Sequence, residues 1–134
     1  MLLPRAEEWW ATWVDDPSVR ARFAGDALLH TDLARENVLI RGGRTRLVGW
    51  ASAMRGAVWI EPAIWVLRLI ADGGQPAAYA EGWACGIPAW EEADPEVLDA
   101  FALAGVRRWE DDPVLGPAAR RWHAHRLAGD RPMV

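Results

Sequence analysis

The clearest local pattern in the chain is a pair of short segments, each part apolar and part polar, on either side of two glycines. Residues 37–41 and 44–48 flank Gly42-Gly43, and a glycine pair suits a two-residue hairpin turn that needs positive φ. Residues 28–30, just before this stretch, form a brief apolar run that is expected to be extended. The pattern therefore predicts a β-hairpin. The pairs expected across its strands are Val38 with Leu47 and Ile40 with Thr45.

Helical spacing of apolar residues predicts helices in most of the remaining chain. Residues 63–70 are apolar nearly all round and follow Glu61-Pro62, so a buried central helix is expected there. Asp94-Pro95 has the form of a helix N-cap followed by a first-turn proline. The apolar stripe behind this cap is Leu98, Phe101, Gly105 and Trp109. Further helices are expected over residues 5–14, 76–85 and 114–127, and from Asp16-Pro17-Ser18 onward with Val19 and Phe23 facing inward.

A short hairpin followed by packed helices is typical of a mainly helical α+β domain. The chain has 134 residues, enough for one domain and too few for two ordinary ones, and no internal repeat or long linker divides it. We therefore expect a single domain over residues 1–134. Within it, residues 1–25 should hold N-terminal helices, residues 26–60 a loop segment with the hairpin, and residues 61–134 a helical subdomain.

Composition and charge exclude several classes of function. The chain carries 15 basic and 19 acidic residues, for a net charge of −4, so a nucleic-acid partner is not expected. All the cations are arginines, which excludes Schiff-base and P-loop chemistry in this chain. The one cysteine, Cys85, excludes internal disulfides and thiolate zinc clusters. No apolar stretch is long enough for a signal peptide or a membrane span, so a cytoplasmic protein without membrane contact is expected.

Tryptophan is unusually abundant, with ten residues against one tyrosine and two phenylalanines. A small domain has limited room to bury so many large rings, and exposed ones favour contact with another molecule. Trp9, Trp10 and Trp13 share one stripe of the first predicted helix. We therefore expect a tryptophan-rich face that serves a homodimer or a partner protein.

The clearest chemical motif lies between the extended run and the hairpin. His30, Asp32 and Asn37 have the spacing H-x-D-x-x-x-x-N, framed by apolar residues on both sides. Phosphoryl transfer needs such a set, because an aspartate accepts or orients the proton of the attacking hydroxyl. An asparagine farther along the same loop then reaches the metal ion that neutralises the nucleotide phosphates.

This segment resembles the catalytic loop of the aminoglycoside and choline phosphotransferase family, which has a protein-kinase-like fold. The resemblance covers residues 26–70 and implies the C-terminal lobe of that fold. It implies that Asp32 is the catalytic aspartate, that His30 supports the loop, and that Asn37 is a metal ligand. Residues 47–50 are similar to the element that carries the second metal-binding aspartate, and Glu61-Pro62 is similar to the pair that opens the central helix.

Two departures from the family pattern bear on activity. Gly49 stands where the family has its metal-chelating aspartate, and adjacent Glu36 is a weak candidate to replace it. Only 29 residues precede His30, and they read as helix without the lysine of a nucleotide-binding lobe. The implied cofactors are therefore not expected here. Magnesium and ATP would bind only if a partner chain supplied the second lobe.

Two classes of function follow from these observations. The first is a pseudoenzyme, a truncated phosphotransferase-like module that binds a small molecule or another protein. The alternative is an enzyme that retains Asp32 as catalytic base, either for phosphoryl transfer to a small-molecule hydroxyl with a partner chain or for ATP-independent chemistry in the same cleft. The metal role of Asn37 is vestigial under the first reading.

The other candidate residues have simpler interpretations. Cys85 is expected to be a small buried hydrophobic residue. His123 and His125 point to different faces of a helix, so they are not expected to bind a metal together. Around the hairpin, the arginines form either a local anion site or a solvated cluster that protects the strand edges. These arginines are Arg41, Arg44 and Arg46.

Overall fold

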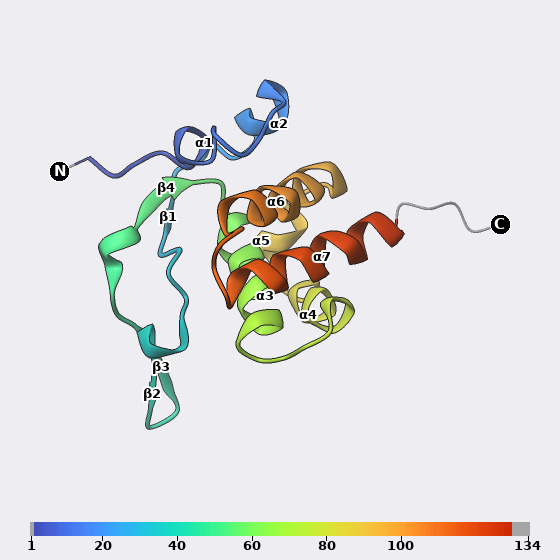
Figure 1. Cartoon of the computed structure of the whole chain (residues 1–134). Coiled ribbons are helices and arrows are strands. Elements are labelled where there is room, and N and C mark those ends of the chain that lie inside the picture. The colour runs from blue at the N-terminus through green and yellow to red at the C-terminus, as the bar shows by residue number, and fades with distance from the viewer. Residues whose placement is uncertain (1, 130–134) are drawn as a thin grey trace.

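The protein has a body of packed helices with a small, separate β part, as Figure 1 shows. This computed structural model describes residues 2–129, of which about 53% are helical. Its α-helices are α1 (Ala6–Trp9), α2 (Pro17–Ala21), α3 (Ile60–Ala71), α4 (Ala77–Ala84), α5 (Pro88–Glu91), α6 (Pro95–Arg108) and α7 (Leu115–Gly129). Its strands are β1 (Ala27–Leu29), β2 (Val38–Arg41), β3 (Arg44–Leu47) and β4 (Met54–Gly56). The expected mainly helical α+β class is therefore confirmed.

Aspartate side chains cap the starts of α2 and α6, both as expected. Asp94 accepts a hydrogen bond from the backbone N–H of Val97 (2.9 Å) and begins α6. Asp16 accepts one from the N–H of Ser18 (2.8 Å) and begins α2. Local capping chemistry therefore places these helix starts without help from the rest of the fold.

The first helix is shorter than expected. Residues 5–14 were predicted as helix, but the helix ends at Trp9. Beyond it the chain continues in turns, with a hydrogen bond from the N–H of Trp13 to the carbonyl of Trp10 (3.0 Å). Trp10 and Val14 are buried, so packing of this turn against the core replaces regular helix there. The short helix α5 was also not predicted.

Aromatic rings fill the centre of the helical body around Phe101 of α6. Helix α3 contacts α4 and α7, and α6 packs on α7. The Phe101 ring lies 5.6–6.2 Å from four other aromatic rings, centroid to centroid. These rings are Trp10, Phe23, Trp59 and Trp122. The central helix α3 is buried along most of its length, as its apolar sequence predicts.

Two antiparallel pairs make up the β part. Strands β1 and β4 pair at the edge of the core, and β4 was not predicted. Strands β2 and β3 form the expected hairpin, and Gly42 and Gly43 in its turn have φ of 57° and 75°. The register is the predicted one, with Val38 opposite Leu47 and Ile40 opposite Thr45.

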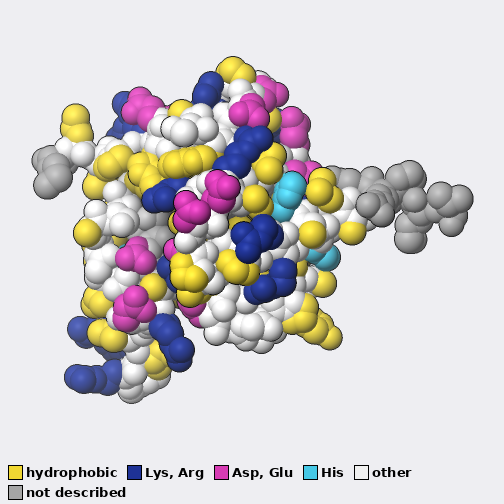
Figure 2. All heavy atoms as spheres, in the orientation of Figure 1, with side chains coloured by type: hydrophobic (Ala, Val, Ile, Leu, Met, Phe, Trp, Pro, Cys, Tyr) yellow, Lys and Arg dark blue, Asp and Glu magenta, His cyan; other side chains and the backbone are white. Residues whose placement is uncertain are grey.

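The hairpin extends away from the helices, at the lower left of Figure 1. Its tip is solvated, since Ile40 is 75% exposed. Because side chains alternate along a strand, one face of the ribbon carries three arginines and Leu39. Those arginines are Arg41, Arg44 and Arg46, and basic side chains gather at this tip in Figure 2.

The structure also bears on the expected burial of Cys85 and on the expected lack of a membrane-spanning helix. Cys85 is exposed, so its expected burial is wrong; it follows the end of α4, whose buried positions are Ala80 and Ala84. Within residues 2–129, none of the helices combines the length and apolar character that a bilayer crossing requires.

Candidate functional site

The segment between β1 and β2 is irregular and is held in place by His30. The His30 side chain is fully buried. Its Nδ1 accepts a hydrogen bond from the backbone N–H of Asp32 (3.2 Å), and its Nε2 lies 2.7 Å from the carbonyl oxygen of Val48. Because a backbone N–H only donates and a carbonyl only accepts, the ring is neutral with its proton on Nε2. His30 therefore ties the start of the loop to the strand that returns from the hairpin.

Glu61, in the first turn of α3, holds the same loop from the other side. Its Oε1 accepts the backbone N–H of His30 (2.8 Å), and its Oε2 accepts that of Thr31 (3.2 Å). Burial raises the pKa of Glu61 above its ordinary value, and the two backbone hydrogen bonds oppose that rise. The sequence marked Glu61 only as the start of a helix, so its contact with the loop was missed.

Thr31 has an uncommon backbone conformation. Within the described part of the chain it is the one residue other than glycine with positive φ, at 69°. A threonine is costly in this region, so the surrounding contacts must hold it there. One of them is the hydrogen bond that its Oγ1 donates to the carbonyl of Ser52 (2.8 Å). The bend at Thr31 precedes Asp32, whose side chain reaches the cleft described below.

Asn37 and Gly49 meet at the base of the hairpin. The Nδ2 of Asn37 donates to the backbone carbonyl of Asp32 (2.9 Å), so this amide closes the loop. Gly49 has φ of 72°, and a Cβ placed on it would lie 2.4 Å from Oδ1 of Asn37. The backbone therefore brings position 49 into direct contact with Asn37, and there is no room for a side chain unless Asn37 moves.

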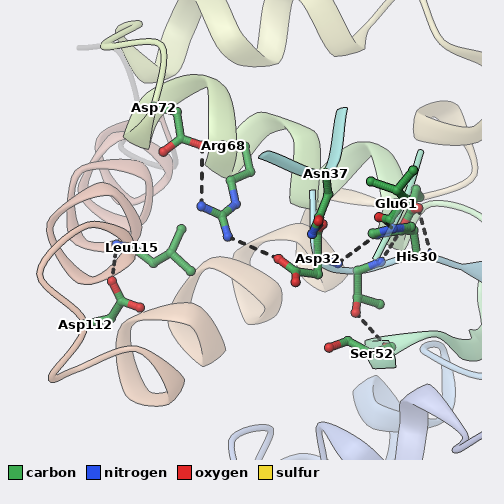
Figure 3. A network of polar contacts seen from close by, with 11 residues as sticks. His30, Asp32, Asn37, Ser52, Glu61, Arg68, Asp72, Asp112 and Leu115 are labelled. Carbon is green, nitrogen blue, oxygen red and sulfur yellow. Dashed lines mark hydrogen bonds and ion pairs between the residues drawn. The ribbon is translucent and has the colours of Figure 1, made fainter. Parts of the chain in front are cut away.

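Asp32 faces Arg68 of the central helix, as Figure 3 shows. Oδ1 of Asp32 lies 3.8 Å from one guanidinium nitrogen of Arg68, and Asp72 lies 3.4 Å from another. The Asp32 side chain is 44% exposed and that of Arg68 only 18%, so solvent weakens this ion pair without removing it. Arg68 was not among the predicted site residues; a single arginine in an apolar helix is the signal that points to it.

A cleft of about 370 Å³ lies beside Asp32. It is formed by five segments that are distant in sequence. Its lining residues are Pro4, Trp9, Trp10, Thr31, Asp32, Ala51, Ser52, Ala53, Met54, Ile64, Leu67, Arg68, Arg108, Trp109 and Leu115. The charged residues among these are two arginines and one aspartate. Of the three predicted site residues, Asp32 lines the cleft, while His30 and Asn37 position its loop.

The residues beside Asp32 do not fit a magnesium ion. Mg²⁺ prefers at least one or two carboxylates in addition to phosphate oxygens. Gly49 supplies no carboxylate, and the side-chain amide of Asn37 is already hydrogen-bonded to the loop backbone. The positively charged guanidinium of Arg68 lies beside the Asp32 carboxylate, where a metal ion would have to bind. Within residues 2–129, no three His, Cys, Asp or Glu side chains are grouped so that they could hold a metal ion.

The remaining histidines and tryptophans lie elsewhere. On α7, Nε2 of His125 is 3.5 Å from the Glu81 carboxylate, and His123 is half-buried. Trp9 and Trp13 are half-buried against the core. In the described chain, the tryptophans with the most exposed rings are Trp50 and Trp83.

Comparison with known proteins gives no match to a family model, to a curated protein or to a solved structure. The resemblance to phosphotransferases therefore stays a hypothesis based on residues 26–70 and the contacts among them.

Proposed function

We propose that the chain is a phosphotransferase-like binding module that holds a small molecule beside Asp32 and does not transfer phosphate by itself. The observation that carries this proposal is the contact between Gly49 and Asn37. The resemblance puts a metal-binding carboxylate at position 49, and here the Asn37 side chain occupies the space that a Cβ at this position would need. Phosphoryl transfer depends on charge neutralisation at this point, so its loss affects the reaction directly.

Arg68 supports the same proposal from the other side of the loop. A guanidinium nitrogen 3.8 Å from Asp32 already supplies positive charge where a metal ion would supply it. A divalent cation near Asp32 would be repelled by Arg68, which is largely buried and cannot move freely into solvent. The cleft is thus better suited to a ligand that needs no metal.

The loop contacts support a binding role. His30, Glu61 and Asn37 all hold backbone groups, and this leaves Asp32 partly exposed at the cleft wall. A cleft wall fixed in this way loses little conformational entropy when a ligand binds. These residues thus serve as positioning residues in the proposed module.

The test is the thermal stability of the whole chain with Mg²⁺-ATP, because a ligand raises the melting temperature only if it binds the folded state. We expect no shift with Mg²⁺-ATP or with ATP and a chelator. A saturable rise that needs magnesium and disappears in Asp32→Asn would contradict the proposal.

The alternative function is an enzyme that uses Asp32 as a general base. One observation favours it: the Asp32 carboxylate lines the cleft and is 44% exposed, so it can reach a substrate hydroxyl or a water molecule. Hydrolysis of small nitrophenyl esters is a direct probe of such a base. Activity that is lost in Asp32→Asn and kept in Asp72→Asn would favour the enzyme, because Asp72 contacts the same arginine without lining the cleft.

A homodimer or partner protein is a further part of the proposal. Ile40 on the hairpin is 75% exposed, and Trp50 is 45% exposed, with its ring centroid 4.5 Å from that of His30. A partner there would cover the site as well as the hairpin. Sedimentation at micromolar concentration tests self-association, and a purely monomeric species would exclude the homodimer.

A further inference from the structure

Arg108, the last residue of α6, lines the same cleft as Asp32, and the part of the cleft around it is called the Arg108 end here. Its guanidinium carbon lies 5.1 Å from the ring centroids of both Trp9 and Trp13, and 6.0 Å from that of Trp109. Arginine between aromatic rings is held by cation–π attraction. Arg108 is therefore fixed in the cleft wall by neighbours that supply no negative charge.

Hydrogen-bond donors at this end lack partners. Within residues 2–129, Nε of Arg108 is buried without a hydrogen-bond acceptor, and no carboxylate lies within 4.0 Å of its guanidinium. Trp10, another wall residue, is 1% exposed and its Nε1 also has no acceptor. Buried donors are nearly always satisfied in folded proteins. Both nitrogens are closed off from solvent, so a ligand in the cleft contacts the half-buried Arg108 through its other, less buried atoms, and the wall around these nitrogens supplies no acceptor of its own.

The acids around this end do not compensate for Arg108. Asp112 interacts electrostatically with Arg68 and Arg108, but its carboxylate accepts the backbone N–H groups of Val114 and Leu115 (both 2.8 Å). Asp112 does not line the cleft. Asp32 does, and it is opposed there by Arg68. The charge that a ligand meets at the Arg108 end is therefore positive.

The other residues that line the cleft indicate what the uncharged part of a ligand should be. The lining of the cleft also includes the apolar side chains of Met54, Ile64 and Leu67. The faces of Trp9 and Trp13 already carry Arg108, so they are not free to form a cage for a cationic ligand. An apolar body with an acidic group matches this arrangement.

We propose that the cleft binds a small organic anion, with its acidic group on Arg108 and its apolar body over Met54, Ile64 and Leu67. The inference rests on the proposed function, since it names the class of ligand that the module holds. An acidic group on a guanidinium forms charge-assisted hydrogen bonds, which are about twice as strong as neutral ones. The Arg108 end thus selects for charge, while the apolar wall tolerates a range of shapes.

The experiment compares three probes that share one phenylethyl-sized body and differ in the head group: phenylacetate, 2-phenylethanol and 2-phenylethylamine. Binding to the whole chain is followed by tryptophan fluorescence and by melting temperature. We expect phenylacetate to bind about tenfold more tightly than the alcohol, and the amine to bind most weakly. Equal binding of acid and alcohol, or stronger binding of the amine, would overturn the proposal.

Variants then locate the head group. Arg108→Gln should weaken phenylacetate binding about tenfold and leave 2-phenylethanol unchanged. Arg120→Gln, on an exposed residue of α7 outside the cleft, should change neither. Unchanged phenylacetate binding in Arg108→Gln would contradict the placement of the acidic group on Arg108. If that variant does not fold, the relative affinities of the acid, the alcohol and the amine for the unmodified chain decide the question. Binding of Mg²⁺-ATP would reject the proposed function while leaving this order intact, so the two failures are distinguishable.

Discussion

The helical body and the loop-and-hairpin segment of residues 26–56 are held together by different forces. In the body, α3, α6 and α7 bury apolar side chains around Phe101, and many weak contacts share the stabilisation. In the loop, a few polar side chains hold specific backbone groups, with His30 and Glu61 as the main examples. The hairpin beyond them has little contact with the body.

This difference explains how one cleft can combine a wall of core residues with a wall made by a polar loop. Apolar packing tolerates changes of shape at similar volume, whereas a buried polar contact has one geometry. The body therefore supplies stability and one wall of the cleft. The loop supplies the position of Asp32, at the cost of strain at Thr31.

The largest expected effect tests the apolar side of this comparison. Phe101→Ala should lower the free energy of unfolding by about 3–5 kcal/mol, because it leaves a cavity among four aromatic rings. Urea unfolding measures the loss. Tyr79→Ala is the control, since Tyr79 is 71% exposed and its replacement should change stability by less than about 0.5 kcal/mol.

The next effect tests the close contact at the base of the hairpin. Gly49→Ala should destabilise the protein by about 2–4 kcal/mol, because it combines a left-handed residue with a clash against Asn37. Gly74→Ala is matched to it, since Gly74 also has positive φ (63°) but open space around it. That control should cost only about 1 kcal/mol. Equal losses would show that Asn37 yields easily and that position 49 is not crowded.

Glu61 provides a smaller effect that is specific to the loop. Glu61→Gln replaces one of the two oxygens that accept backbone N–H groups with an NH₂ group, and about 1 kcal/mol of stability should be lost. Hydrogen exchange should speed up at the amides of His30 and Thr31 and not in α6 or α7. Uniform acceleration over the whole chain would contradict a local role.

The difference in stability between the unmodified protein and Glu61→Gln should depend on pH. The pKa of Glu61 is raised in the folded state, so its contribution to stability is fully present below its ordinary pKa of 4.5. It is lost as pH rises through the higher folded-state pKa. The stability advantage of the unmodified protein over Glu61→Gln should therefore shrink as pH rises above 4.5. An advantage that grows over this range would mean that the hydrogen bonds outweigh burial.

The smallest effect tests the isolation of the hairpin. Arg41 and Arg44 lie directly opposite each other, and like charges in such pairs are unfavourable. Arg44→Glu should stabilise the hairpin by about 0.2–1 kcal/mol and leave the melting temperature of the body almost unchanged. Hydrogen exchange at the backbone amides of residues 38–47 measures the gain in hairpin stability. A large change in the melting temperature would show that the hairpin is coupled to the body.

Much of the fold was predictable because local patterns determine it. The glycine pair and the two segments that flank it predicted the hairpin register, and Asp94 and Asp16 predicted helix starts. The spacing of His30, Asp32 and Asn37 predicted one shared loop, in which all three now lie.

The rest of the site depends on contacts between distant residues, which no local pattern contains. Glu61 reaches a loop thirty residues earlier, and Arg68 meets Asp32. Arg108 lies over the ring of Trp9, although most of the chain separates the two residues in sequence. Sequence spacing carries no information on such pairs when one chain is read alone, so half of the cleft was missed.

The most direct test of the central claim is one pair of titrations of the full chain, followed in its ¹H–¹⁵N spectrum. Phenylacetate should shift the indole signals of Trp9, Trp10 and Trp109, which line the cleft. Mg²⁺-ATP should leave the amides of Asp32 and Asn37 in place. Saturable shifts of those two amides with Mg²⁺-ATP, and none of the indole signals with phenylacetate, would contradict an anion-binding module derived from a phosphotransferase-like loop.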